Sequence, residues 1–136
     1  MLIWDLENYQ CIRTIEEVDC NSLLELANGT IIVGGCGEII VINKDNYQIE
    51  KKIKSQEVAY LTSMIELRDE NLLCGSEEGE LCVYDIHLKT IKIKEMAHTK
   101  SIPSLLVINN NKFISCSDDC TIKIWDYQKV TKIIKL

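Results

Sequence analysis

The chain has 136 residues, of which 46% are hydrophobic and 26% charged, and its formal net charge at pH 7 is −6. This composition is typical of one folded domain and excludes an intrinsically disordered chain. The net negative charge and the scattered Lys and Arg residues argue against a nucleic-acid partner, and no apolar stretch is long enough to span a bilayer.

The N-terminal part contains two strand-like segments, at residues 2–5 and 11–15, and the first of them introduces a repeat. A short, mostly apolar segment that ends in Asp or Asn recurs four times. The closing residues lie 38, 42 and 41 positions apart and are Asp5, Asn43, Asp85 and Asp126. A period of this length indicates one supersecondary unit used several times. Repeated units mostly build surfaces, so the repeat favours a binding protein over an enzyme.

Each full unit is expected to open with a strand. These first strands are predicted at residues 20–26, 61–67 and 102–108. The segments align without gaps, and their serines, Ser22, Ser63 and Ser104, follow one another at intervals of 41 positions. Short apolar runs with partial alternation predict largely buried strands. Turn residues follow each run, and Asn28-Gly29 is the strongest short-range hairpin signal among them.

Three further strands complete each unit. The second strand is predicted at residues 31–33, 72–74 and 113–115. Tight turns at residues 34–37, 75–79 and 117–120 lead into the third strand, which ends at the Asp or Asn position. The fourth strand follows a polar corner and is predicted at residues 11–15, 49–53, 90–94 and 130–134. No segment has a convincing helical period, so the sequence predicts an all-β fold of four-stranded antiparallel units.

The last unit resembles a WD repeat. Residues 115–126 read Ser-Cys-Ser-Asp-Asp-Cys-Thr-Ile-Lys-Ile-Trp-Asp. They follow the family pattern Ser-x-Ser-x-Asp-x-Thr and then aliphatic, basic, aliphatic, Trp and Asp. Ala97-His98 stands where the family usually has Gly-His. The resemblance implies a β-propeller, in which each unit is a four-stranded blade around a central channel.

The resemblance also implies a structural hydrogen-bond network inside the last blade. Its members would be His98, Ser115, Asp119 and Trp125. A buried carboxylate and a buried indole N–H each need a partner, and an imidazole together with a hydroxyl can link them.

The two earlier blades depart from this pattern. The middle blade has Glu57, Cys74, Glu78 and Tyr84 at the four corresponding positions. The first blade has Glu16, Val33 and Ile42 at three of them. Because the network cannot form from these residues, we expect both blades to depend on apolar packing alone and to be the less stable part of the protein.

The implied organisation is a single WD-repeat region over residues 1–136. It contains a half-blade at residues 2–15 and blades at about 16–54, 55–95 and 96–136. Three and a half blades cannot close into a ring, and open strand edges invite pairing with another chain. The chain would then be a fragment of a larger propeller, a unit that associates with itself or with further blades, or an open arc capped by a partner. A fragment or assembly-dependent piece is the leading hypothesis.

Three patterns invite a chemical role. His98, Ser115 and Asp119 have the residue types of a hydrolase triad, but there is no Gly-x-Ser-x-Gly elbow, and a structural network explains them better. Cys116, Cys120 and His98 lack the fourth ligand of a closed zinc site. The glycine-rich turn at residues 34–37 leads into a strand, whereas a phosphate-binding loop opens a helix. We therefore predict no enzymatic activity, no metal and no cofactor.

The resemblance implies a non-catalytic scaffold that binds proteins or peptides on a propeller face. Family members use residues near the start of the first strand and in the turn after the second. In this chain those residues are Tyr60, Ser101, Glu77 and Asp118. Acidic residues at 77, 78, 80, 118 and 119 suggest a negative rim that docks a basic peptide, against the alternative of solvated turns.

Other functions remain as alternatives: a substrate-recognition piece of a ubiquitin ligase, a part of a signalling assembly, and a small propeller-type enzyme. The cellular setting is indicated by seven cysteines, an odd number, and by a first decapeptide without signal-peptide features. Both favour a reducing environment, so we expect a cytoplasmic protein, or alternatively a nuclear one. Its expected partners are proteins or peptides, with neither nucleic acid nor membrane.

Overall fold

The computed structural model describes residues 1–54, 60–67, 71–87, 90–109, 111–126 and 131–135, without the side chains of 90–93 and 131–135. Within these residues the protein has fourteen strands in four antiparallel sheets and no helix. The described part accordingly contains no helix that is a candidate for crossing a membrane. The prediction of an all-β fold built from four-stranded antiparallel units is confirmed.

The four sheets follow one another along the chain. The first is a two-stranded hairpin of β1 (Leu2–Trp4) and β2 (Cys11–Thr14). The second contains β3 (Ser22–Glu25), β4 (Ile31–Gly34), β5 (Glu38–Ile42) and β6 (Ile49–Lys54). The third contains β7 (Leu61–Glu66), β8 (Asn71–Ser76), β9 (Glu80–Asp85) and β10 (Thr90–Met96). The fourth contains β11 (Ser104–Asn109), β12 (Lys112–Cys116), β13 (Ile122–Asp126) and β14 (Thr131–Lys135).

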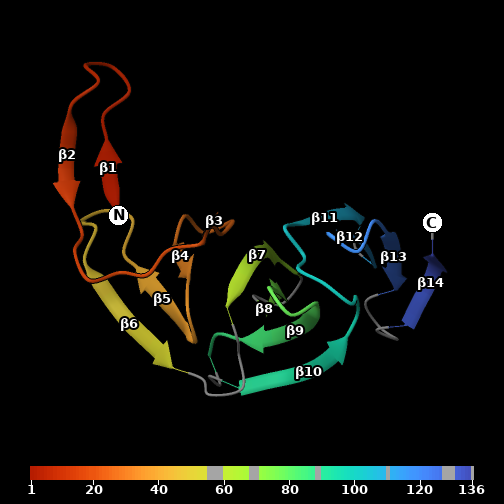
Figure 1. Cartoon of the computed structure of the whole chain (residues 1–136). Helices are drawn as coiled ribbons and strands as arrows, with labels where there is room; N and C mark the ends of the chain where they lie inside the picture. The colour runs from red at the N-terminus through yellow and green to blue at the C-terminus, as the bar shows by residue number, and fades with distance from the viewer. Residues whose placement is uncertain (55–59, 68–70, 88–89, 110, 127–130, 136) are drawn as a thin grey trace.

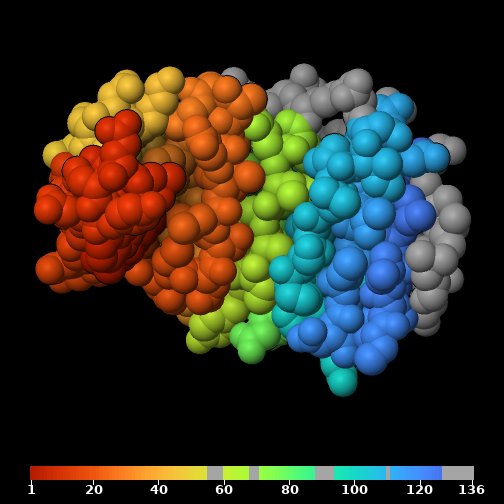
Figure 2. Space-filling model, turned by 90° about the horizontal axis from the view of Figure 1, so that it is seen from above, coloured from red at the N-terminus to blue at the C-terminus, as the bar shows by residue number. Residues whose placement is uncertain are grey.

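The sheets are arranged side by side as the blades of an open arc (Figure 1). In each four-stranded sheet, neighbouring strands pair in chain order. The first strands of the sheets lie next to one another, since β3 contacts β7 and β7 contacts β11. The fourth strands, β6, β10 and β14, lie on the outer side of the arc (Figure 1). Seen from above, the hairpin and the three sheets succeed one another across the molecule (Figure 2).

Apolar side chains pack between successive sheets. Those between the second and third sheets include Ile32, Val41, Leu61, Leu72 and Tyr84. Those between the third and fourth include Leu73, Val83, Leu105, Phe113 and Trp125. Those between the hairpin and the second sheet include Met1, Ile3, Val33, Ile40 and Ile42. Because side chains alternate along a strand, the second and third sheets each pack one face on the preceding sheet and the other face on the following one.

Polar bonds also cross the junctions between sheets. The carboxylate of Glu66 in β7 accepts a hydrogen bond from the backbone N–H of Ala27 at 2.7 Å. The hydroxyls of Thr62 and Ser63, also in β7, both donate to the carbonyl of Ile102 at 2.7 Å. The expectation that the middle blade depends on apolar packing alone is therefore wrong, because its first strand forms polar bonds to both neighbours.

Candidate functional site

The structure brings the four predicted network residues together in the fourth sheet. His98 lies in the loop before β11, Ser115 in β12, Asp119 in the turn that follows and Trp125 in β13. His98 Nδ1 lies 3.0 Å from Asp119 Oδ2, and His98 Nε2 lies 2.7 Å from Ser115 Oγ. Trp125 Nε1 donates to the same Ser115 Oγ at 2.8 Å. The side chains of these four residues thus form one continuous network of hydrogen bonds.

The direction of each bond follows from the chemistry of the groups. An ionised carboxylate only accepts, so Nδ1 of His98 carries the proton that points at Asp119. Nε2 is then an acceptor and receives the hydroxyl proton of Ser115, whose oxygen in turn accepts the indole N–H of Trp125. Each buried polar side-chain atom of this network has a partner, which is the condition for a buried network to stabilise a fold.

Thr121 is a fifth member that the sequence reasoning missed. Its hydroxyl lies 2.5 Å from Asp119 Oδ1 and 3.0 Å from His98 Nδ1. The backbone N–H groups of Thr121 and Thr99 also donate to Asp119, at 3.0 and 3.1 Å. The signal was present, because Thr closes the Ser-x-Ser-x-Asp-x-Thr pattern. A hydroxyl two residues after the Asp can reach its carboxylate, so this spacing identifies Thr121 as a network member.

The geometry favours structure over chemistry at these residues. Ser115 and His98 are 0% and 1% exposed, so a substrate carbonyl cannot reach the hydroxyl that a hydrolase would use. The Trp125 indole instead stacks on Phe113, with ring centroids 6.1 Å apart. Within the described part of the chain no group of His, Cys, Asp and Glu side chains is placed to hold a metal ion.

Asp119 gives the network a pH dependence. Burial by itself would raise the pKa of this carboxyl, but hydrogen bonds from the Thr121 hydroxyl, the Thr99 N–H and His98 hold the pKa well below its ordinary value of 3.8. A carboxyl with a lowered folded-state pKa stabilises the fold fully above its unfolded pKa, and this contribution is lost as pH falls through the folded pKa.

We therefore expect the stability advantage of the wild type over Asp119→Asn to be constant from pH 7 to about pH 5 and to shrink progressively below about pH 4. Urea unfolding at a series of pH values measures it. Asp118→Asn is the matched control, since the neighbouring carboxylate is exposed. An advantage that persists unchanged to pH 2 would contradict the assignment.

The corresponding positions of the middle blade do not form this network. Tyr84, at the position of Trp125, is buried, and its hydroxyl has no hydrogen-bond partner within the described residues. Burial, followed by the neighbouring Cys82, raises the pKa of the Cys74 thiol and keeps it protonated. Glu78 is exposed, and Glu57 lies outside the described residues. In the first blade Val33 and Ile42 are buried apolar residues, and Glu16 is exposed.

The four residues predicted for a partner-binding face also come together. Tyr60, Glu77, Ser101 and Asp118 line one cleft of about 560 Å³, with Cys20, Asn21, Thr62 and Pro103. Tyr60 and Glu77 belong to the third sheet's blade, and Ser101 and Asp118 occupy the equivalent positions in the fourth sheet's blade. The backbone N–H of Glu77 donates to the carbonyl of Tyr60 at 2.9 Å, and that of Asp118 donates to the carbonyl of Ser101 at 3.1 Å. We call this hollow the face cleft.

The face cleft is electronegative. Two of its lining residues are carboxylates, and none of those described is Lys or Arg. Tyr60 is 50% exposed. A hydrogen bond with Cys36, followed by partial burial and the nearby carboxylates of Glu77 and Asp19, raises the pKa of its phenol, so it stays neutral and protonated at physiological pH.

The predicted acidic rim is narrower than the sequence suggested. Glu77, Glu78 and Asp118 are exposed, as expected. Asp119 instead turns inward to His98, and Glu80 pairs with Lys94 at 3.1 Å. The rim therefore consists of Glu77, Glu78 and Asp118, in the turns after β8 and β12, and Glu77 and Asp118 line the face cleft.

Comparison with known proteins finds a family model that matches the C-terminal part of the chain. Residues 89–126 match the model described as "WD domain, G-beta repeat". The chain is similar to human DDB1- and CUL4-associated factor 10, at 36% identity over 67 residues, covering 48% of this chain and 12% of that protein. It is also similar to polyadenylation factor subunit 2 of Candida albicans, at 26% identity over 98 residues, covering 71% of this chain and 18% of that protein.

A third relative is the WD repeat domain-containing protein 83 homolog of Dictyostelium discoideum, at 29% identity over 89 residues, covering 63% of this chain and 27% of that protein. The chain thus spans about an eighth to a quarter of the length of these relatives. Among solved structures, the WD40 repeats of RRP9 superpose with a TM-score of 0.77 at 13% identity, covering 90% of this chain and 40% of that one. The fold of the chain is therefore that of consecutive WD40 propeller blades.

Proposed function

The chain belongs to the WD-repeat β-propeller family, and on this premise we propose that it is a non-catalytic scaffold whose face cleft binds a basic segment of a partner protein. The proposed setting is cytoplasmic, or alternatively nuclear. The observation that carries the proposal is the convergence of Tyr60, Glu77, Ser101 and Asp118 into one cleft. These residues come from two blades and are far apart in sequence, yet they line a common surface.

The chemistry of the face cleft favours a positively charged ligand. Glu77 and Asp118 supply two carboxylates on residues that are exposed. The neutral Tyr60 ring offers a face on which a Lys or Arg side chain can stack, and such contacts are strongest where water is partly excluded. A volume of about 560 Å³ is in the range of sites that hold a few residues of a peptide.

Replacing Tyr60 by alanine is expected to weaken the binding of basic peptides by about tenfold, because truncation of a central interface aromatic costs more than 1 kcal/mol. The probe is an array of Lys- and Arg-containing peptides, each paired with a copy in which Gln replaces the basic residues. The wild type should retain the basic member of a pair. Because Tyr60 is half-exposed, its truncation should leave the unfolding midpoint unchanged.

Tyr9→Ala is the matched control, since Tyr9 is 79% exposed in the N-terminal hairpin and is not among the residues that line the face cleft. It should bind as the wild type does. The double variant Glu77→Gln, Asp118→Asn should lose the preference for basic peptides and the salt dependence of binding. Peptides that bind regardless of these residues, or pairs that bind equally with Gln, would contradict the proposal.

A second candidate follows from one of the relatives. The similarity to human DDB1- and CUL4-associated factor 10 favours an association with the two proteins in that name. Titration of the chain with purified DDB1 and CUL4 tests it, and the absence of saturable binding would exclude it. Substrate recognition within a ubiquitin ligase and assembly of signalling complexes stay predictions of the sequence. The small propeller-type enzyme gains no support from the buried Ser115.

A further inference from the structure

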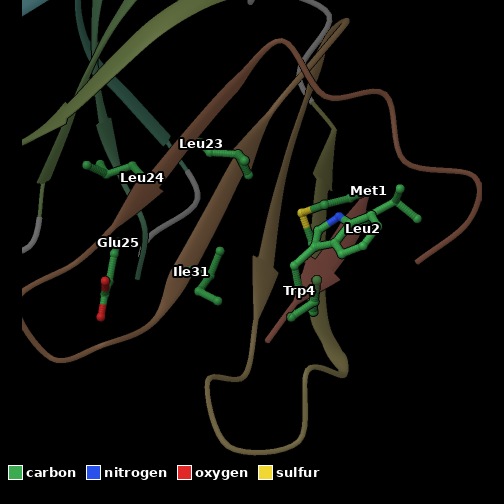
Figure 3. Close-up of a pocket in the computed structure, with 8 residues that line it drawn as sticks. Met1, Leu2, Trp4, Leu23, Leu24, Glu25 and Ile31 are labelled. Atoms are coloured by element: carbon green, nitrogen blue, oxygen red, sulfur yellow. The ribbon is translucent and has the colours of Figure 1, made fainter. Parts of the chain in front are cut away.

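The second sheet differs in chemistry between its first and its fourth strand. The first strand, β3, borders a hollow of about 380 Å³ beside the N-terminal hairpin, whose lining has one carboxylate, Glu25, and no Lys or Arg. Figure 3 shows apolar side chains on both sides of this hollow, among them Leu23, Ile31, Met1 and Leu2. The fourth strand, β6, lies on the outer side of the arc (Figure 1), and its lysines are exposed. We call residues 51–54 of β6 the basic edge.

The basic edge belongs to an uneven distribution of charge along the chain. The fourth strands β2, β6, β10 and β14 contain eight of the fifteen Lys and Arg residues, namely one in β2, three in β6 and two each in β10 and β14. They contain only two of the twenty-one Asp and Glu residues, one in β6 and one in β10. The fourth strands are therefore positively charged in a chain whose net charge is −6.

The lysines of the basic edge are not neutralised by other side chains of the described structure. Lys51, Lys52 and Lys54 are exposed, and none of the described residues forms an ion pair with them. Lys94, at the position of Lys52 in the next blade, is instead paired with Glu80 at 3.1 Å. The positive charge of β6 is thus available to a partner, whereas the charge of Lys94 is already compensated.

The side chains of the basic edge point to both faces of the second sheet. Ile53 is buried in the cluster between the second and third sheets. Because side chains alternate along a strand, Lys51 lies on the same face as Ile53, and Lys52 and Lys54 lie on the opposite face. The register agrees, since Lys52 is opposite Ile40, which packs against the hairpin. A strand laid along β6 therefore meets positive charge on each face.

The backbone of the basic edge is open on its outer side. Among the described strands, β6 pairs only with β5. In an antiparallel ladder every second residue directs its N–H and C=O away from the partner strand. The regular ladder with β5 starts at Lys51, because Glu50 has no cross-strand partner and its carboxylate accepts a hydrogen bond from the Asn43 side chain at 2.7 Å. A further strand can therefore extend the sheet along residues 51–54.

From these positions we propose that the basic edge binds an acidic segment of a partner protein in extended conformation, as a fifth strand antiparallel to β6. Main-chain hydrogen bonds to β6 supply affinity, and side chains at alternate positions supply specificity. Two carboxylates on one face pair with Lys52 and Lys54, and a third on the other face pairs with Lys51. This surface shares no residue with the face cleft and has the opposite charge, so the two proposals can fail independently.

A second copy of this chain is a poorer occupant of the basic edge. Two β6 strands paired with each other would place lysine beside lysine, and like charges on directly opposite residues are destabilising. The outer strands β10 and β14 each contain two lysines as well. Lysines on an edge strand commonly prevent such pairing between copies. The same charges that repel another copy attract an acidic strand, so one set of lysines selects the partner.

Nucleic acid also fits this surface less well than an acidic peptide does. Binding to a phosphate backbone depends on many clustered Lys and Arg residues. The basic edge supplies three, in a chain that is negatively charged overall. The open N–H and C=O groups along β6 are matched by the backbone of another strand, whereas phosphates match only the donors.

The probe is a synthetic peptide of about eight residues in which Glu alternates with Val or Thr, the length of an ordinary strand. Calorimetric titration into the full chain should show saturable binding that weakens as salt is added. A copy with Gln in place of Glu tests the charge. A second copy, methylated at every backbone nitrogen, keeps the carboxylates but lacks N–H donors. Both should bind at least tenfold more weakly, and only the unmodified peptide should slow amide hydrogen exchange at residues 51–54.

The double variant Lys52→Glu, Lys54→Glu should weaken binding of the Glu peptide by about tenfold or more, because two attractive cross-strand pairs become repulsive. Lys100→Glu, Lys112→Glu is the matched control, since it changes the net charge equally at two exposed lysines of the fourth blade. It should bind as the wild type does. Tyr60→Ala should also leave this binding unchanged, because Tyr60 lines the face cleft.

Three results would overturn the proposal. One is a wild-type chain that shows no saturable binding of the Glu peptide, or that binds the methylated copy equally well. Another is an equal loss of binding in the two double variants, since the effect would then follow net charge alone. The third is a single-stranded oligonucleotide that displaces the peptide at lower concentration than the peptide itself. Circular dichroism checks folding, and Lys52→Gln, Lys54→Gln replaces the Glu variant if that one does not fold.

Discussion

Replacing His98 by alanine is expected to destabilise the protein by about 3 kcal/mol, the effect of breaking a buried polar network and leaving a cavity. His98 is 1% exposed and contacts Asp119, Ser115 and Thr121. Without the imidazole, the hydroxyl of Ser115 loses its acceptor and the Asp119 carboxylate loses a donor. Urea unfolding followed by tryptophan fluorescence measures the change, because Trp125 belongs to the same network.

The chain offers a matched control. Its two histidines are His87 and His98, and His87 lies exposed in the turn after β9. The backbone N–H of His87 bonds the Asp85 carboxylate, and this bond survives the change to alanine. His87→Ala should therefore alter stability by less than about 0.5 kcal/mol. Equal effects of the two substitutions would show that the network does not hold the last blade together.

Gly79→Ala is expected to destabilise the protein by about 3–4 kcal/mol or to prevent folding, because two independent penalties act on one position. The backbone of Gly79 has φ of +91°, in the region that L-residues rarely adopt. A Cβ added there would lie 2.4 Å from the carbonyl oxygen of His98 and 2.7 Å from that of Lys100. These are backbone atoms of the segment that leads into the last blade, and they cannot give way as a flexible side chain would.

Gly29→Ala separates the two penalties. Gly29 also has a positive φ, of +85°, but the atoms nearest to its added Cβ all belong to the side chain of Lys44, which can move. It should show the backbone strain alone, about 1–2 kcal/mol. Thermal unfolding of both variants measures the difference. If Gly79→Ala costs no more than Gly29→Ala, the close approach of the two blades at Gly79 is not tight in solution.

Much of the fold could be predicted because the same pattern of strands and turns occurs in each repeat unit. The alignment of Ser22, Ser63 and Ser104 predicted the first strands. In the structure β3 begins at Ser22, β7 contains Ser63 and β11 begins at Ser104. The hairpin signal Asn28-Gly29 lies between β3 and β4, and Gly29 has the positive φ that such a turn needs. Pro103 lies immediately before β11, where it removes no ladder bond.

The site was predictable only where a motif fixes the role of a residue. The contacts of His98, Ser115, Asp119 and Trp125 could be anticipated because their residue types and spacing match a known pattern. The bonds from Thr62 and Ser63 to Ile102, and from Ala27 to Glu66, were not anticipated. They join blades rather than strands, and sequence periodicity gives no distance between blades. The inward turn of Asp119, next to the outward Asp118, was likewise invisible to a count of acidic residues.

The third and fourth sheets are stabilised by different kinds of contact. In a linear array, each unit is held by its own contacts and by those with its neighbours. The third sheet has a neighbour on each face, whereas Leu106, Ile108 and Ile122 of the fourth sheet are exposed. The fourth sheet thus contains the full hydrogen-bond network and has exposed apolar side chains. The third sheet lacks this network and is held instead by apolar contacts with the sheets on both sides.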